Sequence, residues 1–407
     1  MTAATDLARA IAGARPRVIA ALAAMLRDLD AAEEAFGEAA ATCLALPQPP
    51  RDPAAWLFVA AKRRALDARR RQAVEARVAG DLARSGEVDD MIRLPEPIPD
   101  ERLRLLFICC HPALAVEARA ALALRVICGL PVAAIAQAFV TSEQAMFQRI
   151  TRAKAKVRKA GIAFDLPPRA RWPERLDAVM LALELAFTAV YADAGGELAA
   201  ALGEDLGAEV ERLVRLLAEL MPEEPEALGL AALVILARSR HAARLDPHGA
   251  MVPLSQQDPA FWDRAAIEEA RVLLDRAAMA GRSGPRQVMA AIQLAHARRV
   301  YGGTTDWVAV LALYDALLAL RPSPMAAIPR ALALAEVEGA EAGLALLEEL
   351  PAERLARARP FHVARSRLLA RCGREAEALE ALDAALATLP PRSERLWLER
   401  QRAALSP

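Results

Sequence analysis

Apolar residues recur at helical spacing along most of this chain, and that pattern constrains its fold more than any other feature. Apolar residues make up 55% of the 407 residues while aromatic residues make up only 4%, so alanine and leucine dominate. Both are strong helix formers. Runs of β-branched residues that alternate with polar ones are nearly absent. The sequence therefore predicts an all-α protein.

Residues 129–161 predict a short helix, a tight turn and a longer basic helix. Val132, Ile135 and Phe139 share one face of the first helix, and the hydroxyl of Ser142 is suited to cap the second, with Glu143 in its first turn. The apolar face of the second helix comprises Ala145, Met146, Ile150, Ala153 and Val157.

Three of the four lysines of the chain fall in this second helix; the full set is Lys62, Lys154, Lys156 and Lys159. A basic helix after a tight turn is the layout of a helix-turn-helix DNA reader. A helical hairpin with a solvated basic face explains the segment equally well, so both interpretations stay open at this point.

A second basic cluster follows a proline-rich break at 47–53, which cannot be helical. The predicted helix 54–71 begins with Trp56 and carries Lys62, Arg63, Arg64, Arg69, Arg70 and Arg71. These cations could contact phosphates, and Trp56 could stack on an unpaired base. Taken alone, Trp56 is better explained as a core anchor.

An acidic run precedes this cluster: Asp28, Asp30, Glu33, Glu34 and Glu38. It suits a basic partner surface, although a solvated helix face with favourable N-terminal carboxylates is the simpler explanation.

Several classes of function find no support. Cys109, Cys110 and His111 are adjacent, so on a helix their side chains diverge by about 100° and do not form a metal site. No phosphate-binding glycine loop and no catalytic constellation rise above chance, so we predict no metal, no cofactor and no enzymatic activity. Five cysteines without a disulfide framework indicate a reducing cytoplasm, and no apolar run is long enough for a membrane span.

The two parts of the chain differ in charge and pattern. Residues 1–165 carry 24 basic and 19 acidic residues, whereas residues 166–407 carry 28 and 33. The second part shows repeated amphipathic helix pairs, expected at 173–192 with 204–220, 224–238 with 262–280, 284–298 with 305–320, 324–337 with 340–349, and 360–371 with 374–388. Stacked pairs of this kind present a groove to a partner.

Taken together, these segments resemble bacterial sigma-70 family factors of the extracytoplasmic-function (ECF) type, in the subgroup with a long C-terminal helical extension. Residues 30–38 are similar to the region 2.2 helix, residues 53–70 to the region 2.3/2.4 helix, and residues 129–159 to region 4. The runs 102–114, 174–179 and 306–315 are also similar to that subgroup.

The resemblance implies four parts: a region 2 helical bundle at 1–75, a linker at 76–98, a region 4 helix-turn-helix at 99–165, and a TPR-like helical domain at 170–405. It implies contacts with core RNA polymerase, through its β′ and β subunits, by Asp30, Glu33, Glu34 and Glu38. It implies contacts with the −10 element by Trp56, Lys62, Arg63, Arg64, Arg69 and Arg70. It implies contacts with the −35 element by Ser142, Glu143, Gln144, Phe147, Gln148, Arg149, Arg152, Lys154 and Lys156.

The resemblance thus implies a cytoplasmic transcription initiation factor that directs core polymerase to specific promoters. Its helical-repeat domain would regulate in cis and could hold a protein partner. An alternative is a helix-turn-helix regulator that senses a protein or peptide without polymerase. A repeat scaffold without a DNA role is a third interpretation.

Overall fold

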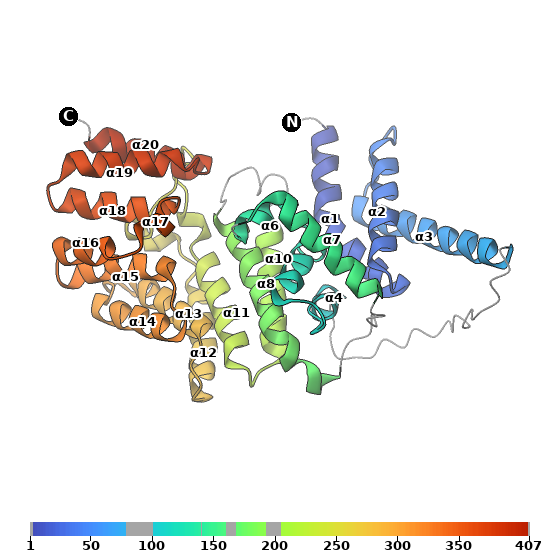
Figure 1. The fold of residues 1–407 in the computed structure, drawn as a ribbon, viewed down its shortest axis with the longest axis horizontal. Coiled ribbons are helices and arrows are strands. Elements are labelled where there is room, and N and C mark those ends of the chain that lie inside the picture. The colour runs from blue at the N-terminus through green and yellow to red at the C-terminus, as the bar shows by residue number, and fades with distance from the viewer. Residues whose placement is uncertain (1–2, 79–100, 140, 160–167, 193–204, 406–407) are drawn as a thin grey trace. The chain divides into compact units, whose positions relative to one another are not determined.

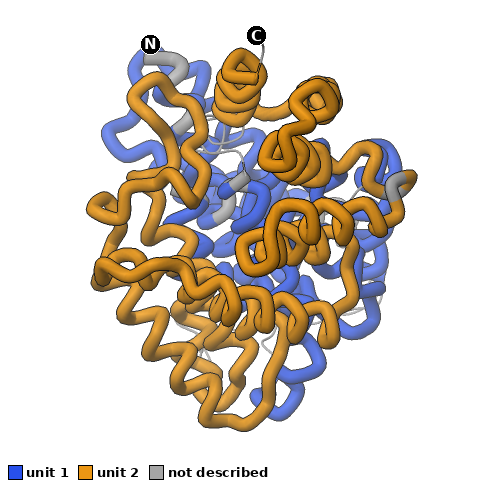
Figure 2. The backbone as a smooth tube through the Cα atoms, turned by 90° about the vertical axis from the view of Figure 1, so that its left-hand side faces the viewer, with its two compact units in different colours: residues 1–192, 198–213 blue, residues 193–197, 214–407 orange. Residues whose placement is uncertain are grey.

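The computed structural model describes residues 3–78, 101–139, 141–159, 168–192 and 205–405 (Figure 1). Within these ranges the chain is helical, with one isolated antiparallel bridge between Leu245 and Met251 and no β-strand. This confirms the predicted all-α class. The chain forms two compact units, coloured blue and orange in Figure 2. Unit 1 comprises residues 1–192 and 198–213, and unit 2 comprises residues 193–197 and 214–407.

Unit 1 begins with three mutually packed helices: α1 (Ala3–Leu26), α2 (Leu29–Leu44) and α3 (Pro53–Val78). The break between α1 and α2 lies at Arg27, whose φ of 54° is left-handed. Asp28 then caps α2, because its carboxylate accepts hydrogen bonds from the backbone N–H groups of Asp30 (2.9 Å) and Ala31 (3.1 Å). α3 continues to Val78, past the expected start of the linker at residue 76, and the rest of that linker lies outside the described residues.

Four shorter helices follow: α4 (Glu101–Cys109), α5 (Val116–Val126), α6 (Val132–Ala138) and α7 (Glu143–Lys159). α4 is buried on all sides, and Leu103, Leu105, Leu106 and Phe107 are each at most 1% exposed. It packs against α1, α5 and the later helix α8 (Pro173–Ala192). A helix whose residues are nearly all buried lies at the centre of a core, and α4 holds that place in unit 1.

α8 is part of this core. It packs against α4, α5 and α6. Before it, the 3-10 turn Arg169–Arg171 leads into Trp172, which is 2% exposed and whose ring lies 5.1 Å from that of Phe107. The buried Arg175 donates a hydrogen bond to the carbonyl of Phe107 (2.9 Å). The expected helical-repeat domain began at residue 170, but this helix is built into unit 1.

α10 (Asp205–Leu220) contributes to both units. Its first half is held to α4 by an ion pair between Glu209 and the buried Arg102. Removal of one partner of a buried ion pair typically costs about 3–5 kcal/mol, so this bridge fixes the start of α10 within unit 1.

Unit 2 continues as a series of helices in which most successive members contact each other. They are α11 (Pro225–Arg238), α12 (Arg264–Met279), α13 (Pro285–Ala297), α14 (Trp307–Leu320), α15 (Pro324–Val337), α16 (Ala340–Glu348), α17 (Ala352–Leu355), α18 (Arg359–Arg371), α19 (Glu375–Ala387) and α20 (Arg392–Leu405). Short 3-10 turns interrupt the series at His241–Ala243, Leu254–Gln256, Pro259–Phe261 and Arg298–Tyr301. The last four predicted pairs are confirmed, since α11 packs on α12, α13 on α14, α15 on α16, and α18 on α19.

Small residues allow two of these helix pairs to approach closely. A Cβ on Gly343 of α16 would lie 2.6 Å from the carbonyl oxygen of Ala331 in α15. A Cβ on Gly229 of α11 would lie 2.8 Å from the backbone nitrogen of Gln287 in α13. The turn between α18 and α19 contains Gly373 with a φ of 74°, which a residue with a side chain rarely adopts. The packing of unit 2 is therefore local and depends on these close contacts.

Candidate nucleic-acid interface

The turn before α7 forms as predicted, with Ser142 as its cap. The Ser142 hydroxyl accepts a hydrogen bond from the N–H of Ala145 (3.2 Å), and its carbonyl accepts one from the N–H of Met146 (3.0 Å). The buried face of α7 comprises Met146, Ile150, Ala153 and Val157. Ala145 is exposed, so its assignment to the apolar face was wrong: one position before Met146, it points about 100° away from that face.

The first half of α7 presents a free polar face. Ser142, Glu143, Gln144, Phe147 and Gln148 are all exposed, and Phe147 reaches 61%. An aromatic side chain that is so exposed at the start of a polar helix gains nothing from the core of its own unit. In a DNA major groove, such a side chain can contact a thymine methyl group, and glutamine can hydrogen-bond adenine.

A recess of about 390 Å³ runs beside this face, between α7 and the segment that opens α5. Its apolar floor comes from Leu114, Ala115 and Ala118, and its α7 wall from Ala145, Gln148, Arg149, Arg152, Ala153 and Lys156. Arg152 donates a hydrogen bond to Gln148 (3.1 Å), which orders two of these polar groups along the helix. The wall is therefore basic, and a strand of phosphates is the kind of ligand it attracts.

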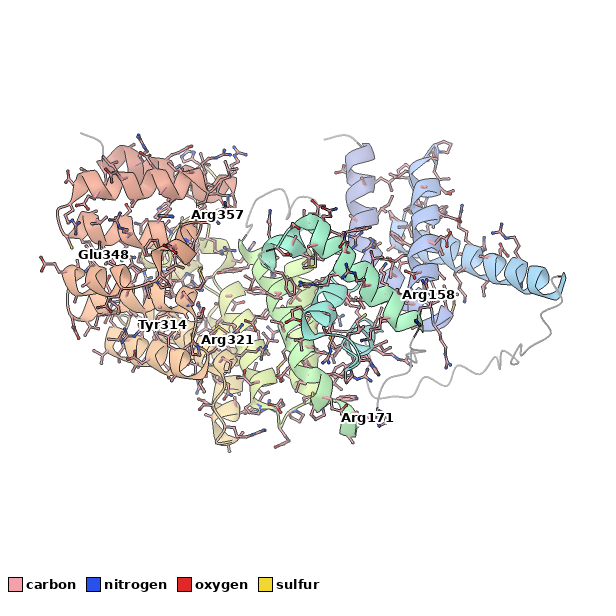
Figure 3. The ribbon with its side chains drawn as sticks, in the orientation of Figure 1. Arg158, Arg171, Tyr314, Arg321, Glu348 and Arg357 are labelled. Atoms are coloured by element: carbon pink, nitrogen blue, oxygen red, sulfur yellow. The ribbon has the colours of Figure 1, made fainter. Side chains whose placement is uncertain are left out.

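The second half of α7 forms ion pairs with residues of α2. Lys154 pairs with Glu33 and lies 3.6 Å from a carboxylate oxygen of Asp30, and Arg158 lies 2.8 Å from the other oxygen of Asp30. Figure 3 labels Arg158 near the end of α7. Lys156 and Lys159 are exposed. The basic residues of α7 thus separate into an exposed set and a set that faces α2.

The acidic residues of α2 are accordingly not one uniform solvated face. Asp30 and Glu33 contact α7, Glu38 pairs with Arg64 of α3 (3.1 Å), and Glu34 is exposed. Glu33 also receives Arg15 of α1 at 2.8 Å. Burial lowers the pKa of the Arg15 guanidinium. The simpler explanation of this run, a solvated face, is therefore wrong for Asp30 and Glu33.

The basic cluster of α3 begins after a capped helix start. The Asp52 carboxylate accepts a hydrogen bond from the N–H of Ala55 (3.0 Å), a cap that the sequence analysis missed although Asp-Pro is a recognisable signal. Trp56 is half-buried beside the buried Leu57. It therefore serves partly as an anchor and keeps part of its ring accessible.

The cations of α3 do not all point outward. Lys62, Arg63 and Arg70 are exposed, whereas Arg64 turns toward α2, where it donates to Thr42 (2.6 Å) and pairs with Glu38. Arg69 has a side chain outside the described set. The exposed members lie on the solvent side of unit 1, and Arg64 joins two of its helices.

The thiols near α4 have structural roles. Burial raises the pKa of Cys109 and of Cys128 to about 12, and it raises that of Cys110 well above its ordinary value. Such thiols stay protonated and unreactive. His111 accepts a hydrogen bond at Nδ1 from the N–H of Ala113 (3.1 Å). Among the described residues, no group of three or more His, Cys, Asp or Glu side chains could hold a metal ion.

Unit 2 holds a recess of its own, of about 580 Å³, which is the size of many small-molecule sites. Its lining includes His296, whose ring lies 5.3 Å from that of Trp307, and Tyr314 of α14, which Figure 3 labels. Burial, together with the charges of Arg240 and Arg299, lowers the pKa of His296 to about 4. Burial raises the pKa of Tyr314 to about 12. The sequence analysis singled out none of these side chains as a site, because their surroundings come from four different helices.

Comparison with known families and proteins agrees with this geometry. Residues 104–157 match the family "Sigma-70, region 4", and residues 175–278 match a "Family of unknown function (DUF6596)". In the described residues no helix is both long and apolar enough to cross a membrane.

A relative in Rhizobium meliloti (strain 1021) matches along most of both chains. It carries the name "Uncharacterized protein R00370" and is 42% identical over 400 residues, which cover 96% of this chain and 94% of the relative. The chain therefore belongs to one family with this Rhizobium meliloti protein, and its region 4 domain supports its place among the sigma-70 factors.

Proposed function

We propose that the chain is a transcription initiation factor that binds core RNA polymerase and directs it to specific promoters. The observation that carries the proposal is the match of residues 104–157 to sigma-70 region 4, combined with the exposed polar face at the start of α7. Such a factor acts by binding its partners with different affinities and requires no catalytic group. The proposed function places the protein beside polymerase in the cytoplasm.

In this proposal the start of α7 reads the −35 element. Gln144, Phe147 and Gln148 face the base edges, with Ser142 and Glu143 at the helix start. Arg149, Arg152, Lys154 and Lys156 then neutralise phosphates, which fixes the register of the helix on the duplex without reading sequence. The recess beside Arg152 and Lys156 provides room for a backbone strand.

In the same proposal, α3 contacts the −10 element. Lys62, Arg63 and Arg70 are exposed cations that suit the phosphates of an opened strand, and the accessible part of the Trp56 ring suits one stacked base. Arg64 acts mainly through its contacts with α2, and Arg69 completes the proposed set. The acidic residues of α2, Asp30, Glu33, Glu34 and Glu38, form the polymerase-binding face, in which Glu34 is unpaired and exposed.

The ECF type and a regulatory role in cis for the TPR-like extension are further parts of the proposal. Two observations support a role in cis: α8 is packed into the core that supports α7, and α10 contributes to both units. A change in unit 2 could therefore act on region 4 through α10. A protein partner of the extension would use the recess lined by Trp307 and Tyr314.

A pull-down with core RNA polymerase tests the proposal. Full-length protein should retain core, and Glu34→Lys should bind at least about tenfold more weakly, because it reverses a charge on the face that meets a basic surface. Glu380→Lys makes the same charge change at an exposed position of α19 and serves as the control, with unchanged binding expected.

If the wild-type protein fails to retain core while it still binds duplex DNA, the polymerase-dependent function is wrong. The polymerase-independent regulator would then account for the helix-turn-helix.

A further inference from the structure

Two recesses of unit 2 adjoin each other and share Tyr314 and Pro329 in their walls. The larger, of about 580 Å³, lies among α13, α14, α15 and α18, and the smaller, of about 350 Å³, lies among α11, α13, α14 and α15. Tyr314, labelled in Figure 3, Trp307 and Leu332 give the larger recess flat, apolar walls. Such walls suit an aromatic ligand.

Three polar groups in the wall of the larger recess have no hydrogen-bond partner among the described residues. They are the imidazole of His296, the indole N–H of Trp307 and the hydroxyl of Tyr314, and all three side chains are half-buried. The pKa of His296 is lowered to about 4 and that of Tyr314 is raised to about 12, so both groups are neutral at pH 7. Each of the three can donate a hydrogen bond to a ligand.

Two arginines close to these groups lack a carboxylate partner within the described part of the chain. Arg240 is only 6% exposed and donates a hydrogen bond to the side-chain oxygen of Gln293 (2.5 Å). Arg299 donates to the carbonyl oxygens of Leu254 (2.8 Å) and Gln257 (3.0 Å). Shielded charges are usually paired with an opposite charge. These two arginines therefore leave an excess of positive charge inside unit 2.

This positive charge reaches the larger recess. Arg299 is part of its wall, and the charges of Arg240 and Arg299 both help to lower the pKa of His296. The one acidic residue described in that wall is Glu336, which accepts hydrogen bonds from Arg371 (2.7 Å) and Arg367 (3.2 Å). The charge of Glu336 is therefore compensated, and the recess combines apolar walls and hydrogen-bond donors with a positive potential.

We propose that the larger recess of unit 2 is a binding site for a small aromatic carboxylate. Its negative charge lies toward Arg299, its ring lies against Trp307 and Tyr314, and the unpartnered donors bind its oxygens. A recess of this volume is within the range of small-molecule sites. The inference goes beyond the proposed function, in which a protein partner would use this recess, and it does not depend on polymerase.

Calorimetric titration of the full chain with benzoate, 2-naphthoate and biphenyl-4-carboxylate tests the proposal. These acids differ in size, and the amide of each serves as a matched neutral probe. At least one acid should bind with a Kd at or below roughly 1 mM, the affinity that good contacts give a molecule of this size. Its amide should bind at least about tenfold more weakly, because it keeps the ring and loses the charge.

Histidine NMR locates the bound acid in the unmodified protein. The chain has five histidines, and the loss of one signal in His296→Gln assigns the resonance of His296. At pH 7 this resonance should move when the acid is added, because the bound ring lies beside the imidazole. His248 is exposed and outside the recess, so its resonance should stay in place.

Matched variants test the hydrogen bond and the charge separately. Tyr314→Phe keeps the ring and removes the hydroxyl, so the acid should bind about threefold more weakly. Tyr301→Phe removes a hydroxyl from an exposed tyrosine outside the recess and should change nothing. Arg240→Gln should weaken binding of the acid about fivefold and leave the amide unaffected. Arg276→Gln, at an exposed position of α12, is the charge control, with unchanged binding expected.

Several results would overturn the proposal. Failure of all three acids to bind would do so, and so would equal affinity for an acid and its amide. Binding that leaves the His296 resonance in place would show that the acid occupies another site. If Arg240→Gln does not fold, the wild-type measurements and Tyr314→Phe still decide. A chain that binds the acid but does not retain core polymerase would keep this site and lose the proposed function.

Discussion

Units 1 and 2 are both all-α, but they are held together in different ways. In unit 1 a single buried helix, α4, contacts helices from both earlier and later parts of the chain. In unit 2 most helices contact the ones next to them in sequence. A stack of nearest-neighbour contacts can lose one member and retain the others, whereas a unit built around one helix depends on that helix. The proposed DNA-reading surfaces lie on the unit with the central helix.

Of the changes considered, Phe107→Ala should have the largest effect on the stability of unit 1. The Phe107 side chain is fully buried and packs on Trp172, so its truncation leaves a cavity and should destabilise unit 1 by about 3–5 kcal/mol. Hydrogen exchange should then rise in α1, α5, α7 and α8 together. Leu369→Ala in α18, also fully buried, is the matched change in unit 2, and its exchange should rise mainly in α15, α16, α18 and α19. If hydrogen exchange rose over equally many helices in the two variants, units 1 and 2 would not differ in how they are held together.

Acid should weaken unit 2 through His296. Its pKa is about 4 in the folded protein and about 6.5 in an unfolded chain, so the unfolded state binds more protons between these values. The contribution is complete above about pH 6.5 and is lost as the pH falls toward 4, by up to about 3 kcal/mol.

Urea unfolding at a series of pH values measures this contribution as the difference between the wild type and His296→Gln. The exposed His248, changed to Gln, is the control and should reproduce the wild-type profile. A His296→Gln profile parallel to that of the wild type would contradict the prediction.

The smallest effects should come from two glycines. Gly343→Ala brings a Cβ within 2.6 Å of the Ala331 carbonyl oxygen, so α15 and α16 must separate, at a cost of about 1–3 kcal/mol. Gly37→Ala, in α2, meets nothing within 4 Å and should stabilise unit 1 by about 0.5–1 kcal/mol. Thermal unfolding of both variants tests this pair, and a gain in stability for Gly343→Ala would show that the α15–α16 contact adapts.

The sequence analysis succeeded where the signal is local. Ser142 was identified as the cap of α7, and Met146, Ile150, Ala153 and Val157 as its apolar face, from spacing alone. It failed where the answer depends on distant contacts. The position of α8 is one case, because its apolar surface is covered by α4 and α5, and amphipathic spacing does not identify the covering partner. Among the site residues, the inward turn of Arg64 was likewise not readable from its neighbours.

The sequence by itself determined that the chain is helical, where most helices begin and end, and which charges lie on α2, α3 and α7. Caps and periodicity act over about four residues, so the chain carries that information locally. Only the tertiary structure decided that α4 is enclosed, that α8 belongs with region 4, and that Lys154 meets Glu33. These contacts join helices far apart in sequence, and they form because each helix must bury its apolar surface against whichever partner the whole fold supplies.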